Sequence, residues 1–137
     1  MPYTLADVAA YLTQVPAWFL ATSVDDQPHV RPFSFAVVEN DKLWFVTARG
    51  KDVYDELQLN PRFELSAWRP GSPWVIVRGT AVFAEPSPAT RQAGFEHMVA
   101  LGEDHTRADD GLLVFFYVSD GFAKLCEITG HEEGFAL

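Results

Sequence analysis

Long runs of apolar, β-branched and aromatic residues, each bounded by turn signals, recur along this chain and predict a mostly β fold. The predicted strands cover residues 17–24, 29–39, 42–47, 63–68, 74–84, 112–119 and 123–129. Tight turns are expected at Asn40 and Asp41, and through Asp120 and Gly121, which would join the last two strands as a hairpin. Gly79 lies inside one run and predicts a bulge or a close backbone approach.

A few helices are expected at the start, in the middle and late in the chain. Thr4 fits an N-cap with Asp7 following in the first turn, and Pro16 ends this first helix. A second helix follows Lys51 and must end near Asn60, because Pro61 disfavours a helical residue before it. A third covers residues 89–101. Roughly seven strands joined by tight turns favour an antiparallel barrel over an alternating βαβ sheet, as one domain over residues 1–137.

The charge balance and the hydropathy pattern exclude two classes of partner. Ten Lys and Arg residues face nineteen Asp and Glu residues, and the formal charge of -9 opposes a phosphate backbone, so we expect no nucleic-acid partner. No apolar run reaches the ~20 residues that a spanning helix needs, and the start of the chain has no basic region before an apolar one. The sequence therefore predicts a cytoplasmic protein without a membrane partner.

The cysteine and histidine pattern does not predict a metal site. Cys126 is the only cysteine, and we interpret it as a small buried apolar residue. The four histidines are far apart and show no ligand spacing: His29, His97, His105 and His131. No combination of Ser, His and an acid indicates a nucleophilic catalytic site.

Arg49 and Lys51 lie where a predicted strand gives way to a predicted helix. Free backbone N–H groups, the positive end of the helix dipole and two cations would converge there, which is typical of a phosphate site. The stretch is not a P-loop, because Lys51 is followed by Asp52 rather than Ser or Thr. Taken alone, it fits better a solvated turn in which Lys51 pairs with Asp55, a contact worth ~0.3 to 0.5 kcal/mol.

The stretch "RPFSF", residues 31–35, favours the ligand site over the solvated turn. Strand alternation sends Arg31, Phe33 and Phe35 to one face and leaves the face of Pro32 and Ser34 shallow enough for a flat ring. Pro32 also removes a ladder donor, which frees neighbouring backbone groups for a ligand. The alternative is an ordinary barrel strand with an edge proline and a surface arginine.

Trp74 opens the long strand after a Pro-Gly-Ser-Pro loop. An exposed indole is costly unless it meets a partner chain or an aromatic ligand. The alternative is that Trp74 closes one end of the barrel.

Three stretches in this order carry a family resemblance: "FLATSVDDQPHVRPFSF", "KLWFVTARGKDVYDELQLNP" and "WVIVRGTAVF". Together they resemble the FMN-binding split barrel of the pyridoxamine 5'-phosphate oxidase-like superfamily, over nearly the whole chain. The tail "DDGLLVFFYVSDGFAKLCEITGHEEGFAL" further resembles the nitroimidazole-resistance (NimA/NimC-like) branch. The resemblance implies a homodimer with two FMN sites at the subunit interface, each built from both chains.

The resemblance also implies which residues hold FMN. Arg31 reaches toward the phosphate or ribityl end, Lys51 binds the phosphate, and Trp74 approaches the flavin from the neighbouring subunit. The strand along the flavin and the loop beside the phosphate supply the remaining residues: Pro32, Phe33, Ser34, Thr47, Ala48 and Arg49. No catalytic residue is assigned, which is expected if the cofactor carries the electrons.

Departures from the family pattern argue against vitamin B6 oxidation. Gly50 replaces a common Ser or Thr, Ile76 replaces a frequent arginine, and the C-terminus lacks the Arg-Leu motif of the true oxidases. We expect an FMN-dependent oxidoreductase that acts on a small molecule such as a nitroaromatic or a quinone. The alternatives are a non-catalytic, stress-related flavin-binding module and a deazaflavin-dependent reductase on the same barrel.

Overall fold

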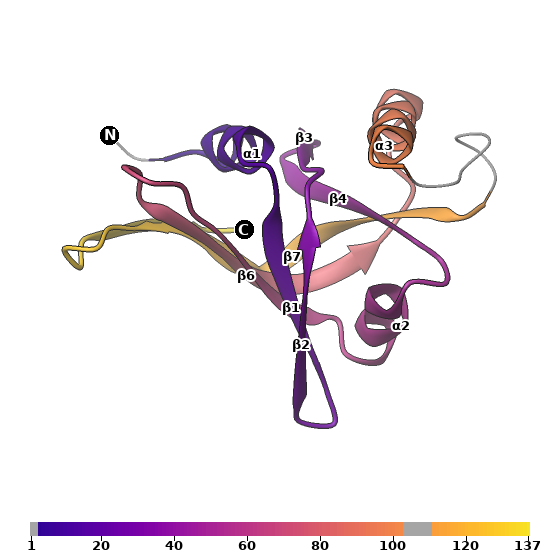
Figure 1. Cartoon of the computed structure of the whole chain (residues 1–137), viewed down its shortest axis with the longest axis horizontal. Helices are drawn as coiled ribbons and strands as arrows, with labels where there is room; N and C mark the ends of the chain where they lie inside the picture. The colour runs from indigo at the N-terminus through magenta and orange to yellow at the C-terminus, as the bar shows by residue number, and fades with distance from the viewer. Residues whose placement is uncertain (1–2, 103–110) are drawn as a thin grey trace.

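The computed structural model describes residues 3–102 and 111–137. Within them, eight strands form one antiparallel sheet in the order β2-β1-β5-β6-β7-β4-β3, with β8 paired to β7. The strands are β1 (Trp18–Val24), β2 (Gln27–Phe33), β3 (Val37–Glu39), β4 (Lys42–Ala48), β5 (Arg62–Ala67), β6 (Trp74–Phe83), β7 (Leu113–Cys126) and β8 (Glu132–Ala136). The helices are α1 (Leu5–Gln14), α2 (Asp52–Leu59) and α3 (Pro88–Ala100), and Figure 1 shows them apart from one another around the sheet.

The predicted strand over residues 29–39 is wrong as a single element. β2 pairs only with β1, while β3 pairs with β4. These two strands are consecutive in the chain but lie at opposite ends of the sheet order, so residues 34–36 carry the chain from one edge to the other. The sheet is therefore not closed, which confirms the split barrel, and β2 is an edge strand that tolerates Pro32.

The predicted C-terminal hairpin through Asp120 and Gly121 is also wrong, because both residues lie inside the continuous strand β7. Asp120 has a φ of 50°, and the register between β6 and β7 shifts beside Gly79. The turn-type residues Asp120 and Gly121 therefore form a β-bulge and do not reverse the chain direction. A Cβ on Gly121 would lie 1.7 Å from the Arg78 carbonyl oxygen. The close approach predicted at Gly79 is confirmed, because a Cβ there would lie 2.8 Å from the Ser119 carbonyl oxygen. The structure also has a strand that the sequence did not predict, β8, which pairs with β7 and contributes to a total of eight strands where roughly seven were expected.

The three predicted helices are confirmed. Thr4 and Asp7 form the reciprocal capping box that the sequence predicts at the start of α1. α2 begins directly after Lys51 and ends at Leu59, with Asn60 as its C-cap. In the described ranges no helix has both the length and the apolar character needed to cross a membrane.

Strand β4 separates two apolar clusters, because its side chains are buried on both faces. Leu43 and Phe45 belong to the main core, which Trp18, Phe63 and Phe116 also fill. The other face of β4 contributes to a second cluster under α3: Trp44, Val46, Ala48, Met98, Leu113 and Phe115. This second cluster fixes α3 against the sheet near the end of β2.

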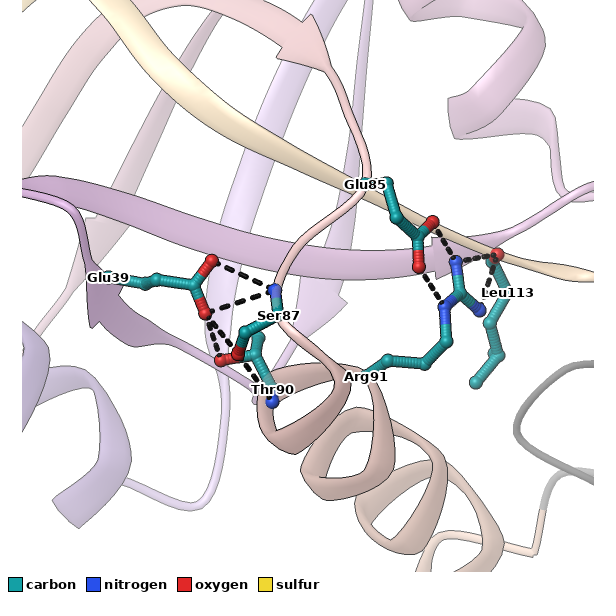
Figure 2. Close-up of polar contacts among 6 residues, drawn as sticks. All are labelled: Glu39, Glu85, Ser87, Thr90, Arg91 and Leu113. Carbon is teal, nitrogen blue, oxygen red and sulfur yellow. Dashed lines mark hydrogen bonds and ion pairs between the residues drawn. The ribbon is translucent and has the colours of Figure 1, made fainter.

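Polar contacts fix the first turns of α3 (Figure 2). The Glu39 carboxylate accepts hydrogen bonds from the Ser87 hydroxyl at 2.7 Å, the Ser87 backbone N–H at 3.0 Å and the Thr90 hydroxyl at 2.6 Å. Arg91 pairs with Glu85, its Nε lying 2.6 Å from Oε1. The Arg91 guanidinium also lies over the Phe115 ring, 5.0 Å from the ring centre. The start of α3 is therefore tied to β3 and β7.

The pKa of Glu39 lies below its ordinary value of 4.5, first because of the hydrogen bond from Ser87 and then because of that from Thr90. Its contribution to the unfolding free energy is therefore complete above pH 4.5 and is lost as the pH falls through the lowered value. Glu39→Gln is expected to cost about 1 kcal/mol at pH 7 and to flatten this acid dependence. Urea unfolding between pH 3 and pH 7 measures both effects. The matched control is Glu127→Gln, because Glu127 is exposed. If the unfolding free energy depends on pH in the same way in the wild type and in Glu39→Gln, the stabilising role of the Glu39 carboxylate is contradicted.

Candidate functional site

A cavity of about 640 Å³ lies between the end of β2, the end of β4, the first turns of α2 and the end of α3, within the range of roughly 300 to 1,000 Å³ typical of small-molecule sites. Six of the residues predicted from the sequence line it: Arg31, Pro32, Phe33, Ser34, Thr47 and Lys51. The fold thus brings two distant sequence stretches to one concave surface.

The remaining predicted residues do not line this cavity. Ala48 is buried in the second apolar cluster. Arg49 is exposed, and its guanidinium donates to the Gly111 carbonyl and the Tyr54 hydroxyl, each at 3.0 Å, so it ties the loop to α2. Trp74 begins β6 opposite Cys126, and its contact with a flavin in a second subunit stays a prediction.

One end of the cavity is built like an anion site. Lys51 occupies the N-cap position of α2, and Gly50 before it has a φ of 89°, which lets the chain turn tightly from β4 into the helix. Thr47, only 2% exposed, adds a hydroxyl-bearing wall from β4. The N-terminal end of the helix and the lysine both favour a negatively charged ligand, although Asp52 also lines this end.

Arg31 is held inside the cavity by a glutamate that the sequence analysis missed. Its guanidinium pairs with Glu56 and also donates to the Thr22 hydroxyl at 3.0 Å and the Leu20 carbonyl at 3.2 Å. Burial alone would raise the pKa of Glu56, but the Thr22 hydrogen bond and the Arg31 charge outweigh it and lower that pKa. Glu56 is therefore ionised at neutral pH, and part of the Arg31 charge is neutralised within the site. His29 Nδ1 lies 3.8 Å from Glu56 Oε2.

Among the described residues, the lining of the other end of the cavity is mostly apolar and includes one polar pair. The Ser34 hydroxyl lies 2.7 Å from Nε2 of His97, which comes from α3. Burial lowers the pKa of His97, so its imidazole is neutral at neutral pH. Phe35 contacts the His97 ring, with the ring centres 5.5 Å apart.

The predicted common face of Phe33 and Phe35 is wrong. Phe33 packs against the main core, where it stacks on Trp18, whereas Phe35 packs against the second cluster beside Phe115. The alternation does not continue because β2 ends at Phe33. The shallow stretch predicted around Ser34 is thus an irregular crossing between sheet edges.

Sequence reasoning missed several residues that line the cavity: His29, Glu56, His97, Met98 and Leu101. Glu56 lies three residues after Val53 and four after Asp52 in α2, and this spacing could have placed it on the same helix face as these two residues. No local signal connects His97 with Ser34, because the two residues are far apart in the chain. Only the packing of α3 onto β4 brings them together.

The described part of the chain contains no group of three His, Cys, Asp or Glu side chains placed to hold a metal ion. His29 and His97 both line the cavity, while exposed His131 contacts Glu133 at 3.3 Å. His105 falls outside the described residues. Cys126 is buried, in agreement with its interpretation as a small apolar residue.

Comparisons with known proteins identify the family. The model of the pyridoxamine 5'-phosphate oxidase family matches residues 5–117. A search of curated proteins found no match.

Solved structures share the fold. A NimC/NimA family protein from Clostridium acetobutylicum is 25% identical with a TM-score of 0.82, and the match covers 97% of this chain and 92% of that one. General Stress Protein 26 from Bacillus anthracis is 20% identical with a TM-score of 0.71, over 97% and 98% of the two chains. A pyridoxamine 5'-phosphate oxidase-related, FMN-binding protein from Nostoc punctiforme is 12% identical with a TM-score of 0.57, over 95% and 90%. The chain belongs to the pyridoxamine 5'-phosphate oxidase family, and its similarity extends to the NimA/NimC branch of that superfamily.

Proposed function

We propose that this protein binds FMN and uses it as an oxidoreductase on a small molecule. The observation that carries the proposal is the cavity of about 640 Å³, which unites the N-terminus of α2 and Lys51 with the irregular Pro32–Ser34 stretch. The Nostoc punctiforme neighbour is an FMN-binding protein, which supports FMN as the cofactor.

The cavity residues fit the chemistry of FMN. Lys51, the first turn of α2 and the Thr47 hydroxyl would hold the phosphate, because they place a cation, backbone N–H groups and a hydroxyl on one wall. Pro32, Phe33 and Ser34 would lie along the ring. The Glu56 pair holds the Arg31 guanidinium in a fixed direction beside the ligand. When bound, FMN supplies the hydride or electron transfer, and the chain supplies placement and electrostatics.

A second copy of the chain would complete the site. The outward face of the β1–β2 hairpin exposes Phe19 at 52% and Val30 at 67%, next to Pro32, which pairs with Phe19 across the two strands. Exposed apolar side chains that gather on one sheet face are typical of protein interfaces. A homodimer through this face would bring partner residues next to the cavity, and Trp74 is our candidate for that role.

Freshly purified protein is expected to carry FMN. The ligand released by heat should show the mass and the absorption bands of FMN, and the stripped protein should quench FMN fluorescence on rebinding. A deazaflavin mass would instead favour the reductase alternative. Colourless protein whose stripped form leaves FMN fluorescence unchanged would contradict the proposal.

A second measurement distinguishes an FMN-dependent oxidoreductase from a protein that only binds flavin. Anaerobic titration with NADH or NADPH, followed by addition of a quinone or a nitroaromatic, should bleach and then restore the flavin absorbance. Similarity to a general stress protein makes a non-catalytic flavin module the second candidate. Flavin that binds tightly but is neither reduced nor reoxidised at a useful rate would favour that module.

A further inference from the structure

We propose that Ser34 and His97 form a neutral hydrogen-bonding pair that binds a carbonyl or nitro oxygen on the ring system held at the α3 end of the cavity. The inference rests on the proposed function and gives the Ser34 hydroxyl and the His97 imidazole a specific role within it. Its physical basis is the polarity of the cavity as the described residues line it: the charged groups lie at the α2 end, and the Ser34–His97 pair lies at the α3 end.

The pair is placed by elements that are far apart in the chain. Ser34 follows the last residue of β2, and His97 lies in the last turn of α3. Both side chains line the cavity, and their Oγ and Nε2 atoms are 2.7 Å apart. The contacts of Glu39 and Arg91 at the start of α3, with the apolar cluster beneath the helix, hold His97 at this position.

Counting donors shows why the pair can bind a ligand. A hydroxyl has one donor and a neutral imidazole has one donor, so their mutual hydrogen bond uses one and leaves the other available. This holds for both tautomers of His97. Among residues 3–102 and 111–137, the only hydrogen-bond partner of either side chain is the other member of the pair. When Nε2 carries the proton, the spare donor is the Ser34 O–H. When Nδ1 carries it, the spare donor is the Nδ1–H on the other side of the same ring, and both residues line the cavity.

The surroundings select the kind of acceptor. Phe35, Met98 and Leu101 make the neighbouring wall apolar. No Lys or Arg of the described residues lines this wall, so an anion would be desolvated there without a compensating cation from them, which is unfavourable. The imidazole itself stays neutral because burial lowers its pKa. A neutral oxygen on a flat ring system can instead accept the hydrogen bond while its carbon framework packs on the apolar wall. The phosphate of the same ligand would lie at the Lys51 end.

Two ligands present this chemistry, and two measurements distinguish them. The oxygen can be a carbonyl of the flavin ring or an oxygen of the substrate. Fluorescence quenching gives the FMN affinity of the stripped protein, which reports a hydrogen bond to the flavin carbonyl. Perturbation of the flavin spectrum gives the affinity of the FMN-loaded protein for menadione, which reports a hydrogen bond to the substrate oxygen.

The test uses His97→Phe, which keeps an aromatic ring beside Phe35 but removes the hydrogen bond, and Ser34→Ala. Each substitution is expected to weaken one of the two affinities by roughly 5- to 30-fold, because the hydrogen bond to the ligand oxygen in the cavity is lost. His97→Gln retains an N–H donor and is expected to restore most of the affinity. The matched control is Glu96→Gln, because Glu96 is the exposed neighbour of His97 on α3 and lies outside the cavity.

If His97→Phe does not fold, Ser34→Ala decides the test. It removes the donor itself when His97 Nε2 carries the proton, and it breaks the mutual hydrogen bond that orients the imidazole when Nδ1 carries it. A small substitution at an irregular position preserves the core. Wild-type protein that binds FMN, with both affinities unchanged in Ser34→Ala and His97→Phe, would overturn the inference and leave only a packing role for the pair. Wild-type protein that does not bind FMN would overturn the proposed function and this inference together.

Discussion

Lys51→Ala is expected to weaken FMN binding by about 1.5 to 3 kcal/mol, or roughly 10- to 150-fold in the dissociation constant. The reason is that Lys51 provides a cation at the N-terminus of α2, where the helix dipole also favours the phosphate. A charge-assisted hydrogen bond to phosphate is stronger than a neutral one, and its loss leaves the anion with the backbone N–H groups and the Thr47 hydroxyl as donors. Fluorescence titration of the stripped protein with FMN measures the change.

Lys124→Ala provides the matched control for this experiment. It removes the same charge from the protein, but Lys124 lies on β7 and contacts Glu132 at 3.4 Å, outside the cavity. Its FMN affinity is expected to stay within about twofold of the wild type, because distant surface charges are screened by salt. If Lys51→Ala, Lys124→Ala and the wild type bind FMN with equal affinity, Lys51 does not bind the phosphate, and the alternative of a solvated turn holds.

Phe116→Ala is expected to lower the unfolding free energy by about 3 to 5 kcal/mol, the usual cost of removing a fully buried phenylalanine. Phe116 is 0% exposed and lies in the centre of the main core. Its ring centre is 5.2 Å from that of Phe83, 5.3 Å from that of Phe45 and 6.2 Å from that of Phe33. The cavity left by alanine would therefore remove contacts on several sides at once.

Urea unfolding followed by tryptophan fluorescence measures the effect of Phe116→Ala. Leu59→Ala is the control, because Leu59 is 73% exposed and its truncation is expected to change the unfolding free energy by less than about 0.5 kcal/mol. A loss below 1 kcal/mol for Phe116→Ala would contradict the core assignment. Because Phe33 both contacts Phe116 and lines the cavity, FMN affinity should also fall in Phe116→Ala.

The strands and helices were largely predictable because their signals are local. The capping box at Thr4, the stop at Pro61 and the β-rich run of β6 act over a few residues, and the structure confirms each. Two local signals were misread. Asp120 and Gly121 have turn chemistry, but pairing of β7 with β6 along its length makes them a bulge. The run from His29 to Glu39 looks continuous, but its halves pair with strands at opposite ends of the sheet order.

The candidate site shows the same division between local and distant information. The sequence by itself determined that a helix begins after Lys51 and that the Pro32–Ser34 stretch is unusual, because residue type and spacing fix helix starts and edge strands. Only the tertiary structure decided that these stretches share a cavity, that Glu56 holds Arg31, and that His97 meets Ser34. These contacts join residues far apart in the chain, and they form because the open sheet and the apolar face of α3 must be buried.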